Sequence, residues 1–226
     1  MTKKEDEKTG VASDMPEVVK RVHNLIVLDE SGSMDSIYRA AFSGVNETLQ
    51  SIRNAKVKHP DQDHTVTLVT FDSSRYNRIY DAVPAEHAKD ITTKQYRPNA
   101  CTPLYDAMGR SITELRWHVN EGDIVLVTII TDGEENASRQ YNRLSVQRLV
   151  EEMKTQGWVF TYIGANQDVE AVASSLSINN HLEFEADDEG TDQMFSKLHV
   201  CRSAFMDKVS NISCESSDLQ DDFFNI

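Results

Sequence analysis

The sequence predicts an α/β protein: a doubly wound, Rossmann-like domain whose mainly parallel sheet carries helices on both faces. Two observations predict this class. Short apolar runs rich in Val and Ile alternate with longer segments whose apolar residues recur at helical spacing. The runs are also nearly continuous in their apolarity, as expected when helices cover both faces of a parallel sheet. We expect one short strand, at an edge of the sheet, to be antiparallel.

The first half of the chain contains three expected strands. The segments 22–29 and 65–72 are rich in Val, Ile, Leu and Thr and end in aspartate, whereas 78–83 is shorter and more polar, as suits an edge. The helix between the first two strands is predicted by apolar residues at helical spacing: Ile37, Ala41, Val45, Leu49 and Ile52. A loop containing a helix-stopping proline is expected at 56–64.

The second half repeats this alternation. A helix is expected over 102–117, with Thr102 as its N-cap and Pro103 at its first position. The remaining elements follow in order: the most apolar strand at 123–132, a helix at 145–157 ended by Gly157, a strand at 158–166, a short helix at 168–176, a strand at 181–186 and a long helix from 191 to about 210. In that last helix the stripe Met194, Leu198, Cys201 and Phe205 predicts core packing.

One domain of this kind is expected over residues 19–210, between two charged ends. Residues 1–18 are predicted to be a flexible charged arm, and residues 211–226 an acidic tail. Near the end of that tail, Phe223 and Phe224 either form a docking peptide, pack against the parent domain or are disordered.

The composition argues against several classes of function. With 37 acidic and 23 basic residues the formal charge is −14, whereas a nucleic-acid partner requires clustered Lys and Arg. No apolar run approaches the ~20 residues of a membrane span, and the N-terminus lacks the apolar core of a secretory signal. The three cysteines Cys101, Cys201 and Cys214 form no CxxC pair, which favours a reducing compartment. We expect a cytoplasmic protein without a nucleic-acid or membrane partner.

Oxygen-bearing side chains occur at three places where the chain reaches one edge of the expected sheet. Asp29, Ser31 and Ser33 follow the first strand in the sequence DESGS, Thr102 begins a helix, and Asp132 ends the most apolar strand. Ligands of such sheets bind beyond the carboxyl ends of the strands, so these side chains are expected to meet. Since neither His nor Cys is among them, they suit Mg²⁺, or else Mn²⁺ or Ca²⁺, and disfavour zinc.

The D-x-S-x-S spacing has a mechanical basis. In a chain leaving an extended strand, alternate side chains point the same way, so Asp29, Ser31 and Ser33 can face one point. Gly32 is expected to let the backbone turn tightly between the serines. Two carboxylates balance a divalent charge. Neutral hydroxyls then leave a coordination position for water or for an acidic side chain of a partner.

Simpler interpretations of the same residues remain open. Ser31, Ser33 and Asp35 could cap the helix that follows them, and Asp132 could be the turn residue of a DG pair. Thr102 can cap a helix and coordinate an ion at once, because a hydroxyl oxygen has two lone pairs. The agreement of all three places in the chain favours the metal site.

Several neighbouring residues are not expected to be ligands. Glu30 lies between two proposed ligands and is expected to point towards solvent. Glu134 and Glu135 either raise the negative potential near the metal or belong to a solvated helix start. Cys101 adjoins a proposed ligand, but no His is placed by the sequence to activate a thiol there. The acidic group at 183–192 lacks the spacing of a calcium-binding loop.

DESGS, the threonine of CTPLYDA and the aspartate of TDGEE, in this order on these elements, resemble the metal-ion-dependent adhesion site (MIDAS) of von Willebrand factor type A (VWA) domains. TYIGAN on a later strand extends the resemblance over almost the whole chain. The resemblance implies that Ser31, Ser33 and, in some states, Thr102 ligate the metal directly. It implies that Asp29 and Asp132 act mainly through water or hydrogen bonds, and that the site is complete.

The function implied by the resemblance is metal-dependent protein binding, in which an Asp or Glu of a protein partner completes the coordination. Two alternatives stay open: a metal-dependent hydrolase, and a regulatory subunit of an ATP-driven chelatase-like or stress-response complex, by analogy with stand-alone cytoplasmic VWA proteins of bacteria. A hydrolase needs an activated nucleophile or water, and the sequence has no GxxxxGK[ST], GxGxxG or GxSxG motif. We therefore expect a non-enzymatic module.

Overall fold

The computed structural model describes residues 19–211, 219, 220 and 222–225. The expected arm at 1–18 and Cys214 lie outside these residues. Within them one sheet is formed by β1 (Lys20–Asp29), β2 (Gln62–Asp72), β3 (Arg75–Pro84), β4 (Ile124–Thr131), β5 (Trp158–Gly164) and β6 (Asn180–Glu183). The α-helices are α1 (Tyr38–Lys58), α2 (Leu104–Leu115), α3 (Arg143–Lys154), α4 (Val169–Ser175) and α5 (Asp188–Asn211).

The strand order β3-β2-β1-β4-β5-β6 confirms the predicted doubly wound fold. Neighbouring strands are parallel except for β2 and β3, which pair antiparallel at one edge. The chain winds outward from β1 to that edge and returns on the other side of β1 with β4. The carboxyl ends of β1 and β4 therefore form the switch point, which is where open sheets of this kind bind ligands.

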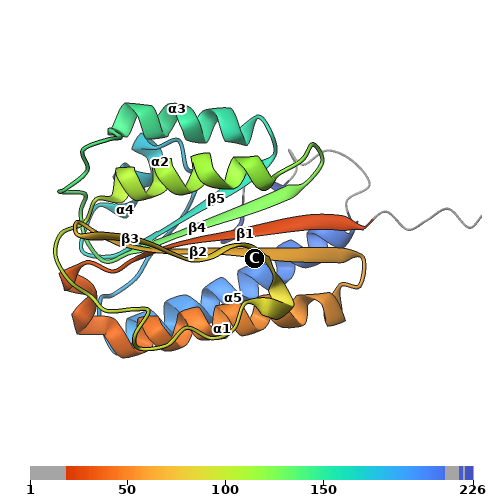
Figure 1. Cartoon of the computed structure of the whole chain (residues 1–226), viewed down its shortest axis with the longest axis horizontal. Helices are drawn as coiled ribbons and strands as arrows, with labels where there is room; N and C mark the ends of the chain where they lie inside the picture. Colours follow the sequence, from red (N-terminus) through yellow and green to blue (C-terminus); the bar gives the residue numbers. More distant parts are fainter. Residues whose placement is uncertain (1–18, 212–218, 221, 226) are drawn as a thin grey trace, which may run out of the picture.

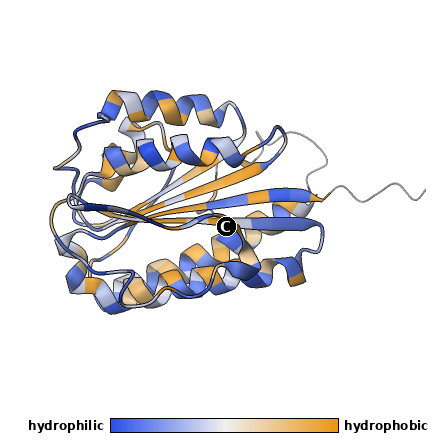
Figure 2. Ribbon diagram, viewed as in Figure 1, coloured by the Kyte–Doolittle hydropathy of each residue, from blue (hydrophilic) through white to orange (hydrophobic). Residues whose placement is uncertain are grey.

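Helices cover both faces of the sheet (Figure 1). The helices α1 and α5 pack on one face, and α2, α3 and α4 pack on the other. In β1, Ile26 and Leu28 belong to the first core, whereas Leu25 and Val27 belong to the second. Figure 2 accordingly shows hydrophobic central strands between helices whose outer surfaces are largely hydrophilic. None of the helices in the described part of the chain is both long and apolar enough to cross a membrane.

The predicted start of the helix at 102–117 is wrong by two residues. α2 begins at Leu104, with Pro103 in the N-cap position and no side-chain capping bond. Pro103 has ψ 64°, which is not helical, so the helix cannot include Thr102. The Thr102 side chain is therefore not the N-cap that the sequence predicted.

Two other boundaries also differ from expectation. The edge strand β3 is longer than 78–83, because it pairs with β2 directly from the turn at Ser73 and Ser74 and continues to Pro84. The expected loop at 56–64 is mostly regular, since α1 continues through Lys58 and β2 already begins at Gln62.

The core on the α1 side includes the end of the chain. The predicted stripe of α5 is buried there: Met194, Leu198, Cys201 and Phe205. The Phe223 ring lies 5.7 Å from that of Phe205, and the Phe223 backbone N–H donates to Asn180 Oδ1 at 2.9 Å. Of the interpretations open for Phe223, packing against the parent domain is the one observed.

Candidate functional site

The carboxylates and serines of the predicted site lie together at the carboxyl edge of the sheet. Asp29 ends β1, and Asp132 directly follows β4, the parallel neighbour of β1. Ser33 Oγ donates to Asp132 Oδ1 at 2.6 Å and lies 3.2 Å from Ser31 Oγ. The loop after β1 is thereby joined to the end of β4 through side-chain oxygens.

Thr102 reaches the same place from the loop before α2. A Cβ built on Gly133 would lie 3.3 Å from Ser33 Oγ and 3.6 Å from Thr102 Oγ1, so the two hydroxyls flank this glycine. Asn136 holds the Thr102 backbone, because Asn136 Oδ1 accepts from Thr102 N at 2.9 Å and Asn136 N donates to Thr102 O at 3.1 Å. A side chain at position 133 would crowd the space between the hydroxyls.

The hydroxyls at this edge are not helix caps. Ser31 occupies the N-cap position of a short 3-10 helix (Gly32–Ile37), yet its side chain makes no capping bond. Ile37 is the N-cap of α1, also without a side-chain bond. The capping interpretation is therefore wrong for the loop after β1. The hydroxyl of Thr102 likewise caps no helix, since α2 has no side-chain capping bond.

Asp29 holds the turn that carries the serines. Its side chain is buried; Oδ1 accepts from the backbone N–H of Ser31 at 2.7 Å, and Oδ2 accepts from Thr131 Oγ1 at 2.6 Å. Burial raises the pKa of Asp29 to about 6, although these hydrogen bonds oppose the shift. The protein thus compensates only part of the cost of burying this carboxylate.

Asp132 carries a carboxylate oxygen without a partner. Its Oδ1 accepts from Ser33, whereas its buried Oδ2 has no hydrogen bond to any described residue. Burial raises the pKa of Asp132, and the Ser33 hydrogen bond lowers it by less. Such an oxygen is costly unless a cation or donor satisfies it. Two carboxylates and three hydroxyls form an all-oxygen donor set, so these residues fit a hard divalent cation.

Two expectations about the first turn are wrong. Gly32 has no positive φ, and the nearest atom to a Cβ built on it would be Ala100 O at 3.4 Å, so the turn results from the 3-10 helix rather than from glycine's freedom. Glu30 is buried instead of solvent-facing. Its Oε1 accepts from the backbone N–H of Arg97 and from Arg75 Nη2, the latter at 3.3 Å, and this pairing offsets part of the cost of burying the charge. Its buried Oε2, like Asp132 Oδ2, has no hydrogen bond to a described residue.

Supporting residues were missed by the sequence analysis. Thr131 holds Asp29, and Asn136 holds Thr102, as described above. Asn166 Nδ2 donates to the carbonyl oxygen of Asp132 at 3.1 Å, and its φ of 56° turns the chain directly after β5. The TYIGAN segment offered a signal for Asn166, but nothing in the sequence distinguishes Thr131 from an ordinary strand threonine.

Glu135 organises the loop after β4. Its Oε1 accepts from the backbone N–H groups of Ala137 and Ser138, at 2.9 and 2.7 Å. Its Oε2 accepts from the N–H of Tyr105 in the first turn of α2, at 2.9 Å. Oε1 of Glu135 thus stabilises the loop itself, and Oε2 attaches the loop to α2, whereas Glu134 is exposed.

A groove of about 710 Å³ adjoins Thr102, whose sequence neighbours line it. Three arginines line the same groove: Arg75, Arg110 and Arg139. The lining aspartates are both occupied, since Asp72 binds Arg75 and Asp106 accepts three backbone N–H groups of residues 139–141. Three arginines and two aspartates give the lining a net charge of +1, so the groove is weakly basic, and Arg110 also donates to Glu114 at 3.0 Å.

No group of three or more His, Cys, Asp or Glu side chains among the described residues could hold a metal ion. The acidic segment at 183–192 therefore forms no such cluster; Asp187 Oδ1 instead accepts from the N–H of Gly190 at 2.7 Å. The site at the carboxyl edge has only two carboxylates and depends on hydroxyls for its other donors. Cys101 is exposed, and its backbone pairs with Ser73.

Neither a protein-family model nor a curated protein matches the sequence. Solved structures do match its fold. The PilB minor pilin from Streptococcus sanguinis superimposes with a TM-score of 0.59 and 12% identity over 87% of this chain, which spans 64% of that protein. The vWF domain of the type V pili tip protein Mfa5 from Porphyromonas gingivalis matches with a TM-score of 0.52 and 10% identity, covering 81% of this chain and 96% of that one.

The SpRpn10 VWA domain matches with a TM-score of 0.50 and 13% identity, covering 80% of this chain and 95% of that domain. At such low identities these likenesses show the fold alone. The chain therefore has a VWA-like fold, as its sequence motifs predicted.

Proposed function

We propose that this protein is a divalent-cation-dependent protein-interaction module. A single Mg²⁺ ion, or Mn²⁺ or Ca²⁺ in its place, binds at a MIDAS formed by five residues: Asp29, Ser31, Ser33, Thr102 and Asp132. An Asp or Glu side chain of a protein partner completes the coordination. The observation that carries the proposal is the unpaired, buried Oδ2 of Asp132 beside hydroxyls that cap no helix.

Of the five residues, the three hydroxyls are proposed to ligate the metal directly, and the two carboxylates support them. The hydroxyls of Ser31, Ser33 and Thr102 are the proposed direct ligands, since none of them donates to a helix end. Asp29 acts on the loop and through water, because both of its oxygens already accept hydrogen bonds. The bound cation supplies positive charge that a partner carboxylate can share. Asp132 contributes the second negative charge and holds Ser33 in place.

The basic groove supports an acidic partner. Arg110 and Arg139 are exposed in it, within reach of a segment whose carboxylate approaches Thr102. Arginine is well suited to this role, because its planar guanidinium can bind a carboxylate through two parallel hydrogen bonds. We propose that the partner presents several acidic residues, of which one completes the metal. A cytoplasmic partner is the corresponding expectation for location.

Partner capture with cell lysate tests this function. Wild-type protein is used with Mg²⁺ and with EDTA, together with Ser33→Ala and with the matched control Ser36→Ala. Ser36 lies in the same 3-10 helix, but its hydroxyl donates to Ser33 O rather than facing Asp132. Ser33 is preferred to Asp29 because truncating Asp29 would leave Ser31 N and Thr131 unpaired in the interior.

The expected result is a set of partners that wild type and Ser36→Ala retain with Mg²⁺ and lose with EDTA, and that Ser33→Ala does not retain. Partners that persist under all conditions would contradict metal-bridged binding. Phosphatase or esterase activity that requires Mg²⁺ and disappears in Ser33→Ala would instead establish the hydrolase alternative.

A further inference from the structure

A buried arginine in α5 lacks partners for part of its guanidinium group. Arg202 is only 3% exposed, and its Nη2 donates to Asn24 Oδ1 of β1 at 2.5 Å. Its Nε and Nη1 are also buried, and neither has a hydrogen-bond partner within the described residues. Unpaired N–H groups of a buried charge are among the costliest groups a protein can contain.

No neighbouring side chain neutralises this charge. Burial is the only cause that lowers the pKa of Arg202, to about 10, so the guanidinium stays protonated at neutral pH. Asn24 and Gln62 are uncharged, and burial lowers the pKa of His64 to about 4, which keeps that imidazole neutral. His64 and Gln62 satisfy each other at 3.1 Å rather than binding Arg202.

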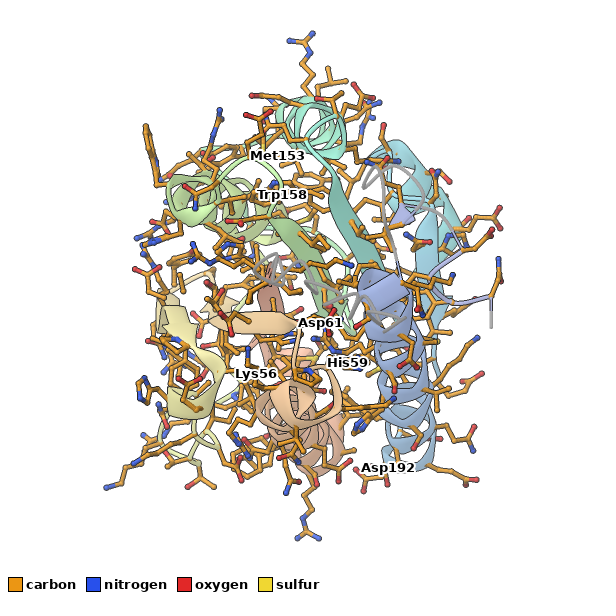
Figure 3. All side chains as sticks on the ribbon, turned by 90° about the vertical axis from the view of Figure 1, so that its right-hand side faces the viewer. Lys56, His59, Asp61, Met153, Trp158 and Asp192 are labelled. Carbon is orange, nitrogen blue, oxygen red and sulfur yellow. The ribbon has the colours of Figure 1, made fainter. Side chains whose placement is uncertain are left out.

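Arg202 also lines a groove between α1 and α5 with a volume of about 510 Å³. Lys58, at the end of α1, lines it too. It donates to Ser203 Oγ at 2.6 Å and to Asp207 Oδ2 at 3.5 Å, both on α5, so this lysine links the two helices that form the groove. His59 and His199 are further lining residues, and exposed Glu47 is the carboxylate among them. Figure 3 shows this end of the molecule, with His59 beside the helix that carries Arg202.

We propose that the groove between α1 and α5 binds a small oxyanion, the phosphate or carboxylate group of a small molecule, on the guanidinium of Arg202. The unpaired Nε–H or Nη1–H of Arg202 can donate a charge-assisted hydrogen bond to an oxygen of such a group. Lys58 exchanges its hydrogen bond to Ser203 for one to the anion, and this movement gives the anion access to the buried nitrogens. A groove of this volume lies within the ordinary range of small-molecule sites.

This site is independent of the metal. Asn24, which binds Arg202, lies five residues before Asp29 on β1, or roughly 17 Å along an extended strand. The net charge of −14 gives no long-range attraction for anions, so affinity must come from the local contacts of Arg202 and Lys58. Binding can therefore be measured with EDTA present and the metal site empty.

The test uses the full chain in EDTA, with inorganic phosphate, acetate and chloride compared at equal ionic strength. The variants are Arg202→Met and Lys58→Met, and the matched control is Arg148→Met, at an exposed position of α3 on the opposite face of the sheet. The melting temperature is measured together with the ¹H–¹⁵N resonance of Arg202 Nε. The phosphate and acetate arms distinguish the two oxyanions.

We expect a saturable rise in melting temperature with phosphate or acetate, and none with chloride, in wild type and in Arg148→Met. The rise is lost in Arg202→Met, and Lys58→Met binds about tenfold more weakly, as expected for one charge-assisted hydrogen bond. Should Arg202→Met not fold, the Nε resonance of wild type decides. A resonance that does not move with either anion would overturn the proposal and assign the Nε–H to buried water. Equal binding by Lys58→Met would overturn the part of the proposal that gives Lys58 a contact with the anion.

Discussion

Two regions of the molecule bury charge of opposite sign without a counter-ion. At the carboxyl edge of the sheet, Asp29 and Asp132 are buried carboxylates with raised pKa values. Between α5 and the sheet, Arg202 is a buried cation. The first region stands on loops that follow strands, where ligand sites of such sheets form, whereas the second lies within a helix. Uncompensated charge is thus the basis of both proposals, a cation at the carboxyl edge and an anion at Arg202.

The regions also differ in the charge state of the titratable side chains beside the buried charges. Glu30, next to the carboxylates, is buried with a cationic partner, Arg75. His64, near Arg202, is instead kept neutral. The carboxyl edge therefore has an ion pair beside the buried carboxylates, whereas the groups around Arg202 are uncharged amides and an imidazole.

The largest expected difference between the regions appears in the pH dependence of stability. His64 has a folded pKa of about 4, below its ordinary 6.5. Between these values the unfolded chain binds a proton that the folded chain does not, so stability falls as the pH is lowered from 6.5 towards 4. The loss amounts to about 3 kcal/mol.

His64→Gln should remove this loss. Urea unfolding gives the free energy of unfolding of each protein at pH 7 and at pH 4.5. The change between the two pH values is then compared between wild type and variant. Asp29 acts in the opposite sense over the same range but is common to both proteins, so it cancels from the comparison. An equal pH dependence in wild type and His64→Gln would show that His64 is not held neutral by the fold.

Glycine substitutions compare the packing of the two regions. A Cβ on Gly44 of α1 would lie 2.1 Å from the Phe195 ring of α5, so Gly44→Ala should destabilise the protein by about 2 kcal/mol through overpacking. At Gly32, by contrast, the added Cβ meets Ala100 O at 3.4 Å without a positive φ. We expect Gly32→Ala to change the free energy of unfolding by less than about 0.5 kcal/mol.

Chemical denaturation of both variants checks this pair. A large loss in Gly32→Ala would restore the view that glycine is required in the first turn. A neutral Gly44→Ala would mean that α1 and α5 can move apart, and with them the walls of the groove near Arg202.

The smallest expected effect concerns the basic groove. Replacing either Arg110 or Arg139 alone with glutamate should weaken partner binding several-fold and reduce its salt dependence, because rim charges act mainly on the rate of association. Arg148→Glu, an equal charge change on the exposed side of α3, is the matched control. Binding kinetics at two salt concentrations measure the effect. Equal losses from all three substitutions would point to net charge rather than to this groove.

The sequence predicts most of the fold and the carboxyl edge because both rest on local patterns. Apolar runs identify the strands, and a parallel sheet brings the residues after β1 and β4 together. The start of α2 was misplaced because Pro103 looked like a first helical residue but has a non-helical ψ. The burial of Glu30 was missed because its partner Arg75 lies after another strand, and the pairing depends on tertiary structure.

The Arg202 region could not be predicted for the same reason. Arg202, Asn24 and His64 come from α5, β1 and β2, and no spacing in the sequence links them. In α5, Arg202 follows Cys201 of the apolar stripe, where a charged residue normally marks the solvent face. Only the packing of α5 against the sheet shows that this guanidinium is enclosed.

Titration calorimetry with Mg²⁺ tests the central claim most directly. Wild type, Ser36→Ala and Asp132→Asn are compared after treatment with EDTA and its removal. We predict one saturable site in wild type and Ser36→Ala, and an affinity at least tenfold weaker in Asp132→Asn, because the variant loses one of the two carboxylate charges. Absence of Mg²⁺, Mn²⁺ and Ca²⁺ binding at millimolar concentrations, or equal affinity in Asp132→Asn, would contradict a cation site at this edge.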